Sequence, residues 1–263
     1  MLCRFCQLEK VMTREHIIPR FIYKFLKSAT PPLIGWNERA GKLISGEATI
    51  ADVCGDCNGG ALSNLDAYGK SFLEENGFLS KIYTKEKTDI NYDYDRLLRW
   101  LLKICYNALA AKNDPGLAYF EKHKDYILYG TPSITQKQIT LFIGLASSVK
   151  ATDEFCAQYP ELVSKERLCG PFSFHINEVI KPYLEYNAAV TGITIGNLFF
   201  HVAIFGDFLL SRSMLINTIC DLSNIKVMNP KGSTISISTC GMTWLERGHK
   251  QKERETLTIA PKI

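Results

Sequence analysis

The sequence predicts an α+β protein in two parts: a zinc-bound module in residues 1–80 and an α+β domain with a largely antiparallel sheet in residues 91–263. Two Cys-x-x-Cys pairs, Cys3/Cys6 and Cys54/Cys57, define the first part. A long helical repeat of apolar residues opens the second part, and later segments rich in β-branched and aromatic residues indicate strands. The polar, charged residues 81–91 between them read as a linker.

The cysteine pairs have the spacing of a structural zinc site. Four thiolates fill the tetrahedral coordination of Zn²⁺, so the ion would close the intervening chain into a loop and would have no position left for a substrate. We therefore expect zinc to support the fold rather than the chemistry. The other five cysteines stand singly in apolar stretches and are expected to pack as small apolar residues: Cys105, Cys156, Cys169, Cys220 and Cys240.

Short elements are expected around these cysteines. A strand over 14–18 should end at Pro19, and helical turns should follow over 21–26. Further short strands are expected over 33–36, 43–45 and 48–53. After Cys57 the apolar residues recur at helical spacing, which places Asn58 at or near the start of a helix.

The second part has stronger signals. Asp93 or Asp95 can cap a helix that ends before Asn113. Gly196-Asn197 is a two-residue hairpin signal between two strands. The expected strands cover 139–146, 172–176, 188–195, 198–205 and 234–238.

The residues that point to chemistry lie between and directly after the cysteine pairs. Histidine suits a general base near neutral pH, and His16 stands in the string Glu15-His16-Ile17-Ile18-Pro19. A carboxylate and an amide oxygen suit a hard cation, so Glu15 and Asn58 are candidate ligands of Mg²⁺ or Mn²⁺. Neighbouring residues on a strand face opposite sides, but an irregular strand end before Pro19 could let Glu15 and His16 reach one cleft.

Asp66 is a further candidate. It lies eight residues after Asn58, about two helical turns, so that both can share a helix face. It would either contact the cation, directly or through a hydrogen bond, or remain a solvated helix carboxylate.

The combined pattern of Cys-x-x-Cys, Glu-His-Ile-Ile-Pro and Cys-x-x-Cys-Asn resembles the zinc-supported HNH endonucleases over about residues 1–75. The resemblance implies a ββα-metal fold and hydrolysis of DNA phosphodiester bonds. It implies His16 as general base, Glu15 and Asn58 as ligands of the catalytic divalent ion, and Cys3, Cys6, Cys54 and Cys57 as ligands of the structural zinc. The position of the middle asparagine holds Thr49, and Asn37 is an alternative donor to the base.

Other functions stay open at this level. The module could bind nucleic acid or protein without hydrolysis, or it could cleave RNA or branched DNA. The second part could recognise the target, bind a partner protein or form a homodimer, and a restriction or anti-phage setting is an analogy only. The net charge of +4 is compatible with nucleic-acid binding, and Arg14 and Arg20 could meet phosphate.

Location and the remaining histidines complete the expectations. No apolar run approaches the roughly 18 residues of a membrane span, and the N-terminus has no signal-peptide core, so we expect a cytoplasmic protein. Structural or surface roles are expected for His123, His175, His201 and His249, and core roles for Trp100 and Trp244.

Overall fold

The structure is a computed structural model, and it describes most of the chain. The described residues are 1–29, 34–37, 42–130, 138–169, 172, 174–183, 188–206, 213, 216–217, 220 and 225–243. Trp244 and His249 lie outside them, as do the side chains of Asn37 and His175.

The N-terminal unit is built on a two-stranded antiparallel ribbon of β1 (Met12–His16) and β4 (Thr49–Cys54). Helical structure follows β4 at once, as α2 (Gly55–Cys57), a π-helical turn η1 (Asn58–Leu62) and α3 (Ser63–Glu75). Pro19 directly precedes α1 (Arg20–Ala29), and the hairpin of β2 (Ile34–Asn37) and β3 (Lys42–Ser45) lies between α1 and β4. The expected order of short strands and helices is thus confirmed, with boundaries shifted by a few residues.

The second part contains a seven-stranded sheet. Its order is β5-β13-β6-β11-β10-β9, and β12 pairs with β6. All pairs are antiparallel except β13 with β6, so the largely antiparallel sheet is confirmed. The strands are β5 (Lys87–Asn91), β6 (Ile139–Ser147), β9 (Phe174–Tyr183), β10 (Ala188–Ile195), β11 (Leu198–Phe205), β12 (Lys226–Val227) and β13 (Thr234–Thr243). β5 falls inside the segment expected to be a linker.

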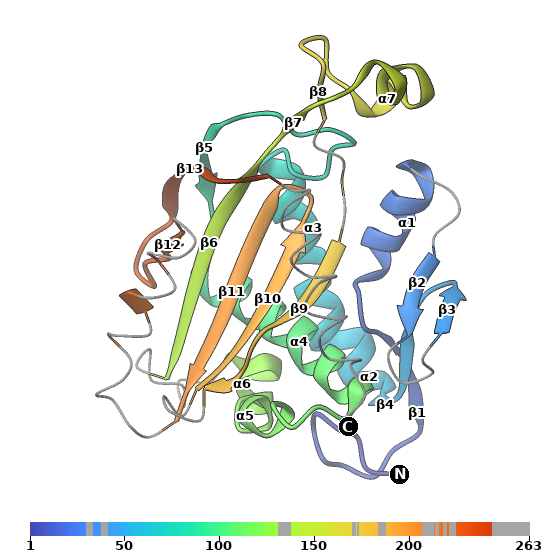
Figure 1. Ribbon diagram of the computed structural model, residues 1–263. Helices are drawn as coiled ribbons and strands as arrows, with labels where there is room; N and C mark the ends of the chain where they lie inside the picture. Colours follow the sequence, from blue (N-terminus) through green and yellow to red (C-terminus); the bar gives the residue numbers. More distant parts are fainter. Residues whose placement is uncertain are drawn as a thin grey trace, which may run out of the picture.

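Helices α3 and α4 lie side by side behind this sheet (Figure 1). α4 (Tyr94–Lys112) begins where the Asp93 side chain accepts a hydrogen bond from the backbone N–H of Arg96, and it ends at Asn113 in a left-handed conformation. A Cβ on Gly69 of α3 would lie 2.1 Å from the Trp100 ring of α4, so glycine permits this close approach. Two short helices follow, α5 (Leu117–Glu121) and α6 (Lys124–Tyr129).

The apolar core runs through both parts of the chain. One cluster of buried residues extends from Cys3 and Phe5 in the N-terminal unit to Ile237 in β13. Alternating residues of β11 divide between this cluster and a second one, with Phe200 in the first and Phe199 in the second. Both faces of the central strands are therefore buried, and the N-terminal unit packs on the same core as the sheet.

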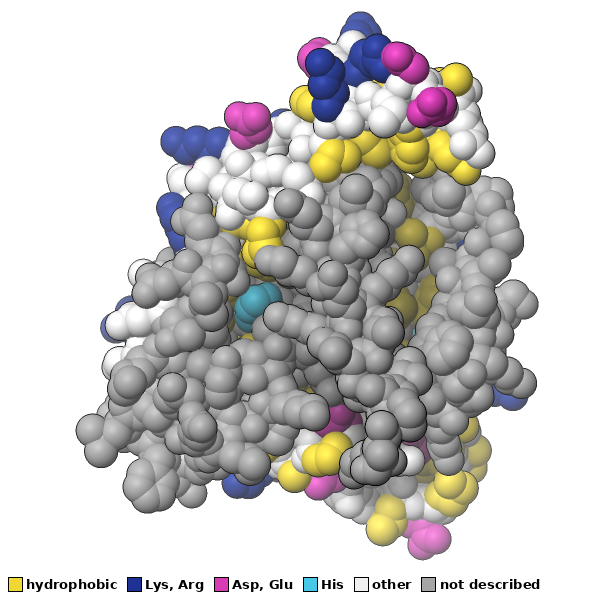
Figure 2. All heavy atoms as spheres, viewed as in Figure 1, with side chains coloured by type: hydrophobic (Ala, Val, Ile, Leu, Met, Phe, Trp, Pro, Cys, Tyr) yellow, Lys and Arg dark blue, Asp and Glu magenta, His cyan; other side chains and the backbone are white. Residues whose placement is uncertain are grey.

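The far end of the sheet carries a small extension. It consists of β7 (Val149–Lys150), α7 (Asp153–Gln158), the 3-10 turn η2 (Pro160–Leu162) and β8 (Leu168–Cys169). Charged side chains of both signs gather over it at the top of Figure 2, and Arg167 pairs with Asp153 there. Among the helices that the structure describes, none is both long and apolar enough to cross a membrane.

Candidate functional site

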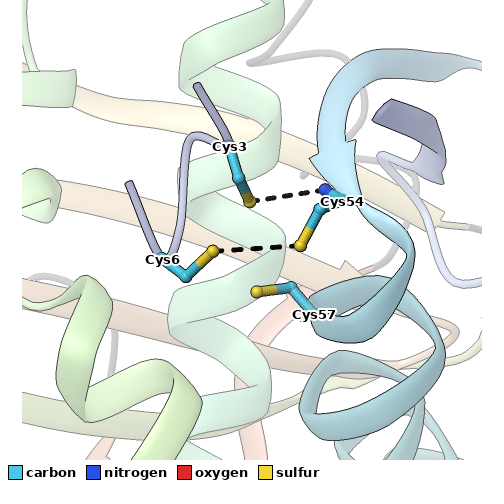
Figure 3. Close-up of side chains that lie close together, drawn as sticks. All are labelled: Cys3, Cys6, Cys54 and Cys57. Carbon is cyan, nitrogen blue, oxygen red and sulfur yellow. Dashed lines mark hydrogen bonds between the residues drawn. The ribbon is translucent and has the colours of Figure 1, made fainter. Parts of the chain in front are cut away.

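The four paired cysteines converge on one point. Cys3 and Cys6 come from the N-terminal turn, Cys54 from the end of β4 and Cys57 from α2 (Figure 3). Their Sγ atoms all lie within 4.8 Å of one another, and those of Cys6 and Cys54 are 3.8 Å apart. Tetrahedral zinc with Zn–S bonds of about 2.3 Å would place its sulfurs ~3.8 Å apart. The tetracysteine group can therefore hold a structural metal ion such as zinc.

The surroundings of the thiols differ in how they affect ionisation. Burial disfavours the Cys3 thiolate, but hydrogen bonds from the backbone of Cys54, Cys6 and Phe5 outweigh it and lower the Cys3 pKa to about 7. Burial, with the neighbouring thiols of Cys54 and Cys6, raises the pKa of Cys57. A bound cation would favour the thiolate form at all four positions.

The N-terminal turn is also fixed to α4 through Arg4. Its Nη2 donates to Oδ1 of Asn107 at 3.0 Å and lies 3.4 Å from Oδ1 of Asp52. The guanidinium carbon lies 4.8 Å from the centre of the Tyr106 ring. The cysteine cluster therefore joins the N-terminal turn to β4 and α2, and Arg4 joins the same turn to α4.

His16 is the last residue of β1. Its side chain is 23% exposed, and Nε2 lies 2.7 Å from Oε2 of Glu47. The pKa of Glu47 is lowered, first by a hydrogen bond from Lys27 Nζ to Oε1 at 2.8 Å and then by His16. Glu47 would hold the Nε2–H tautomer of a neutral His16, which leaves Nδ1 as the atom able to accept a proton.

Glu47 is a site residue that the sequence pattern does not reveal. It stands in the turn before β4, two residues from Thr49, and no motif spacing distinguishes it from other loop carboxylates. Thr49 is the cross-strand partner of His16 and is exposed. The His16 ring forms its hydrogen bond with the Glu47 carboxylate, which accepts, so a carboxylate stands beside the ring where we expected a threonine or an asparagine.

Glu15 faces the opposite side of the ribbon. The register of β1 shifts between Thr13 and Glu15, and it is regular again at Glu15 opposite Ile50 and His16 opposite Thr49. The irregularity thus precedes Glu15, and the two side chains project to opposite faces. Glu15 is only 3% exposed. Our expectation that one cleft receives both side chains does not match this arrangement.

The partners of Glu15 come from α4. Lys103 Nζ lies 2.8 Å from Glu15 Oε1 and 2.6 Å from Asp66 Oδ2. Asn107 Nδ2 donates to Glu15 Oε1 at 3.2 Å, and Trp100 Nε1 donates to Asp66 Oδ1 at 3.3 Å. We refer to Glu15, Asp66 and Lys103 as the buried charge cluster. Asp66, whose side chain is 23% exposed, is therefore a partly exposed carboxylate that pairs with Lys103 between two helices.

Asn58 is the first residue of the π-helical turn η1, in agreement with the expectation that it lies at or near the start of a helix. Its Nδ2 donates to Thr13 Oγ1 at 2.9 Å and to the carbonyl of Arg14 at 3.0 Å, which ties the helix to β1. Only its Oδ1 could bind a cation, because an amide nitrogen that donates hydrogen bonds offers no lone pair.

Glu15, Asp66 and Asn58 do not form a set that fits a catalytic Mg²⁺. Mg²⁺ requires six oxygen ligands at about 2.1 Å and usually keeps several waters. The carboxylates of Glu15 and Asp66 instead share the Lys103 ammonium, which is 1% exposed. We therefore assign no step of any reaction to a divalent ion held by Glu15.

The other singled-out residues have structural or surface positions. Trp100 is fully buried, and His123 and His201 are 5% and 6% exposed. Burial, assisted by Lys122, lowers the pKa of His123 to about 4, which keeps it neutral at physiological pH. Arg14 and Arg20 are exposed, and Arg20 Nε lies 3.9 Å from Glu47 Oε2.

We compared the chain with protein-family models, with curated proteins and with solved structures. None of them matches. The assignment of a function therefore depends on the geometry of these residues alone.

Proposed function

We propose that this protein is an HNH-type endonuclease that hydrolyses DNA phosphodiester bonds with His16 as the general base. The proposal is supported by the order of elements, in which an antiparallel ribbon runs directly into a helix and a tetracysteine cluster joins them. The observation that carries it is the pairing of His16 with Glu47 at a partly exposed position. A histidine held by a carboxylate is suited to remove a proton from water.

In this proposal His16 Nδ1 takes the proton of the attacking water while Glu47 keeps the ring oriented. Arg20 and Lys27 lie beside Glu47, with side chains 67% and 51% exposed. Both can reach solvent, so they are suited to meet the phosphates that flank the scissile bond. The resemblance to HNH enzymes implies a divalent ion, so the assay is run with and without Mg²⁺ or Mn²⁺.

The test is cleavage of supercoiled plasmid by the zinc-loaded protein and by His16→Ala. Loss of a positioned base is expected to slow cleavage roughly 10²- to 10⁴-fold. A matched control is His123→Asn, which changes a buried histidine that the proposal does not use. Cleavage by His16→Ala at the wild-type rate would contradict the proposal. Linear duplex, junction and RNA substrates tested side by side distinguish the substrate class.

The second candidate is a zinc module that binds a partner without hydrolysis. It is favoured by exposed apolar side chains around the N-terminal turn, where Met1, Leu2, Leu8 and Val11 are 74%, 63%, 54% and 86% exposed. Exposed apolar groups of this kind are frequent at interaction sites. If this candidate is right, Leu8→Ser with Val11→Ser abolishes binding of a partner, and no preparation cleaves nucleic acid with any divalent ion.

A further inference from the structure

We propose that the ammonium group of Lys103 occupies the position between Glu15 and Asp66 that a divalent cation would otherwise take. The cation that the N-terminal unit holds at this position is then a side chain of the protein itself. The inference deepens the proposed function, on which its relevance to hydrolysis rests. Its consequence is that Glu15 is no metal ligand, and that any divalent ion used for cleavage binds on the exposed side of β1.

The geometry of the buried charge cluster supports a filled cation site. Lys103 Nζ contacts carboxylate oxygens of two different elements, Glu15 on β1 at 2.8 Å and Asp66 on α3 at 2.6 Å. These are distances of charge-assisted hydrogen bonds. Asn107 and Trp100 donate to the same two carboxylates. Donors from α4 therefore surround both acids.

Lys103 already supplies positive charge to the two carboxylates. The Glu15 side chain is 4% exposed and the Asp66 side chain 23% exposed, and a buried carboxylate such as Glu15 needs positive charge nearby, because removing one partner of a buried pair leaves an uncompensated charge. Lys103 supplies one charge within the cluster. Arg4, whose Nη2 donates to Asn107, lies nearby, but its guanidinium also faces a third carboxylate, Asp52, at 3.4 Å.

The packing of the cluster also disfavours Mg²⁺. The side chains of Lys103 and Glu15 are 1% and 4% exposed, so little room remains for the waters that Mg²⁺ retains. A lysine ammonium is compact and needs only acceptors around it. A divalent ion could enter only after the Lys103 side chain had left the space between the two carboxylates.

The cluster lies directly behind the candidate base. Asn107 Nδ2 donates to Glu15 Oε1 and also lies 3.3 Å from the carbonyl oxygen of His16. His16 itself projects to the other face, toward Glu47. The Lys103 ammonium therefore supports the position of the strand that carries His16, and it is not in reach of a substrate.

The experiment measures Mn²⁺ binding to zinc-saturated protein by electron paramagnetic resonance of the free ion, so that it does not depend on cleavage. Four proteins are compared: wild type, Glu15→Gln, Lys103→Ala and the double variant Lys103→Ala/Glu15→Gln. We expect wild type and Glu15→Gln to bind Mn²⁺ equally. We expect Lys103→Ala to gain one Mn²⁺, and the double variant to lose it again.

The matched control is Lys70→Ala, which removes a half-exposed lysine paired with Glu74 on α3. It should gain no Mn²⁺. The inference would be overturned if wild type bound an ion that Glu15→Gln loses, or if folded Lys103→Ala bound none. If Lys103→Ala does not fold, the comparison of wild type with Glu15→Gln still decides the question. Absence of nuclease activity would affect the proposed function and leave these binding results unchanged.

Discussion

The two faces of β1 carry neighbouring residues in opposite surroundings. On the outer face, His16 and Glu47 are 23% and 21% exposed and are accompanied by Lys27 and Arg20. On the inner face, Glu15 and Lys103 are almost fully buried. The comparison teaches that a shared sequence motif need not mean a shared site. The outer face has the exposure that chemistry on a large substrate needs, whereas the inner face has the burial typical of a structural ion pair.

Removal of zinc should disrupt the structure on both faces of β1. Of the changes considered, we expect it to have the largest effect. Structural zinc sites of this kind contribute on the order of 10 kcal/mol of binding free energy, which becomes folding free energy. We expect chelation, or Cys54→Ser, to unfold the β1/β4 ribbon, as measured by circular dichroism and by protease resistance of residues 1–75. Cys156→Ser is the control, because Cys156 lies in α7 outside the cluster. An unchanged melting curve after verified loss of zinc would contradict the structural role.

Glu15→Gln tests the inner face. The substitution keeps the shape of the side chain but leaves Lys103 with one carboxylate, Asp66. Breaking a buried ion pair costs about 3–5 kcal/mol, and Asn107 can still donate to the Gln oxygen, so we expect the lower end of this range. Urea unfolding measures the change. Glu74→Gln removes a carboxylate from an exposed pair on α3 and should cost less than about 0.5 kcal/mol. Equal effects of the two variants would show that the Glu15 ion pair contributes no more than an exposed one, contrary to its burial on the inner face.

Glu47→Gln tests the outer face, where we expect a small loss of stability and a larger loss of activity. The Glu47 pKa is lowered below its ordinary value of 4.5, so its stabilising contribution is present above that pH and disappears as the pH falls through the lowered pKa. Because Glu47 is partly exposed, the variant should lose under about 1 kcal/mol at pH 7 and little in acid.

The catalytic part of this prediction follows from the orientation of the His16 ring. A glutamine can present its N–H₂ to Nε2 and so favour the other tautomer, which should lower kcat at least roughly 10-fold with a smaller change in KM. Nitrogen-15 NMR of labelled histidine reports the tautomer directly. For the tautomer measurement Lys27→Ala is the control, since it removes the other partner of Glu47 and leaves the His16 hydrogen bond in place. A wild-type tautomer in Glu47→Gln would show that Glu47 does not position the ring.

The sequence predicts local features well and long-range partners poorly. The cysteine cluster, the place of Asn58 near the start of the helical segment and the capping of α4 by Asp93 depend on short spacings and local hydrogen bonds. Lys103 is different. In the apolar repeat of α4, a lysine would ordinarily place its methylene chain along the core and its ammonium group in water. Its two carboxylates come from β1 and α3, and no periodicity connects them with α4.

The same reasoning explains Glu47. It belongs to a turn whose position depends on how β1 pairs with β4, and the register shift between Thr13 and Glu15 decides which face each residue takes. Strand alternation alone indicates that Glu15 and His16 diverge, but it cannot place the shift. The sequence therefore predicts the four cysteines that can hold a metal ion and offers His16 as a candidate base, and the structure adds the groups that surround them.

The position of Lys103 has a consequence for how the chain can be divided. Residues 81–91 have the polar composition of a boundary, yet Glu15 and Asp66 lie before them and the lysine that neutralises both lies after them. A fragment that stops there would keep two acids facing each other without their counterion, along with the apolar surface that α4 covers. The N-terminal unit therefore shares its core and its counterion with the rest of the chain, and we expect a fragment that ends at this boundary to be much less stable than the whole protein.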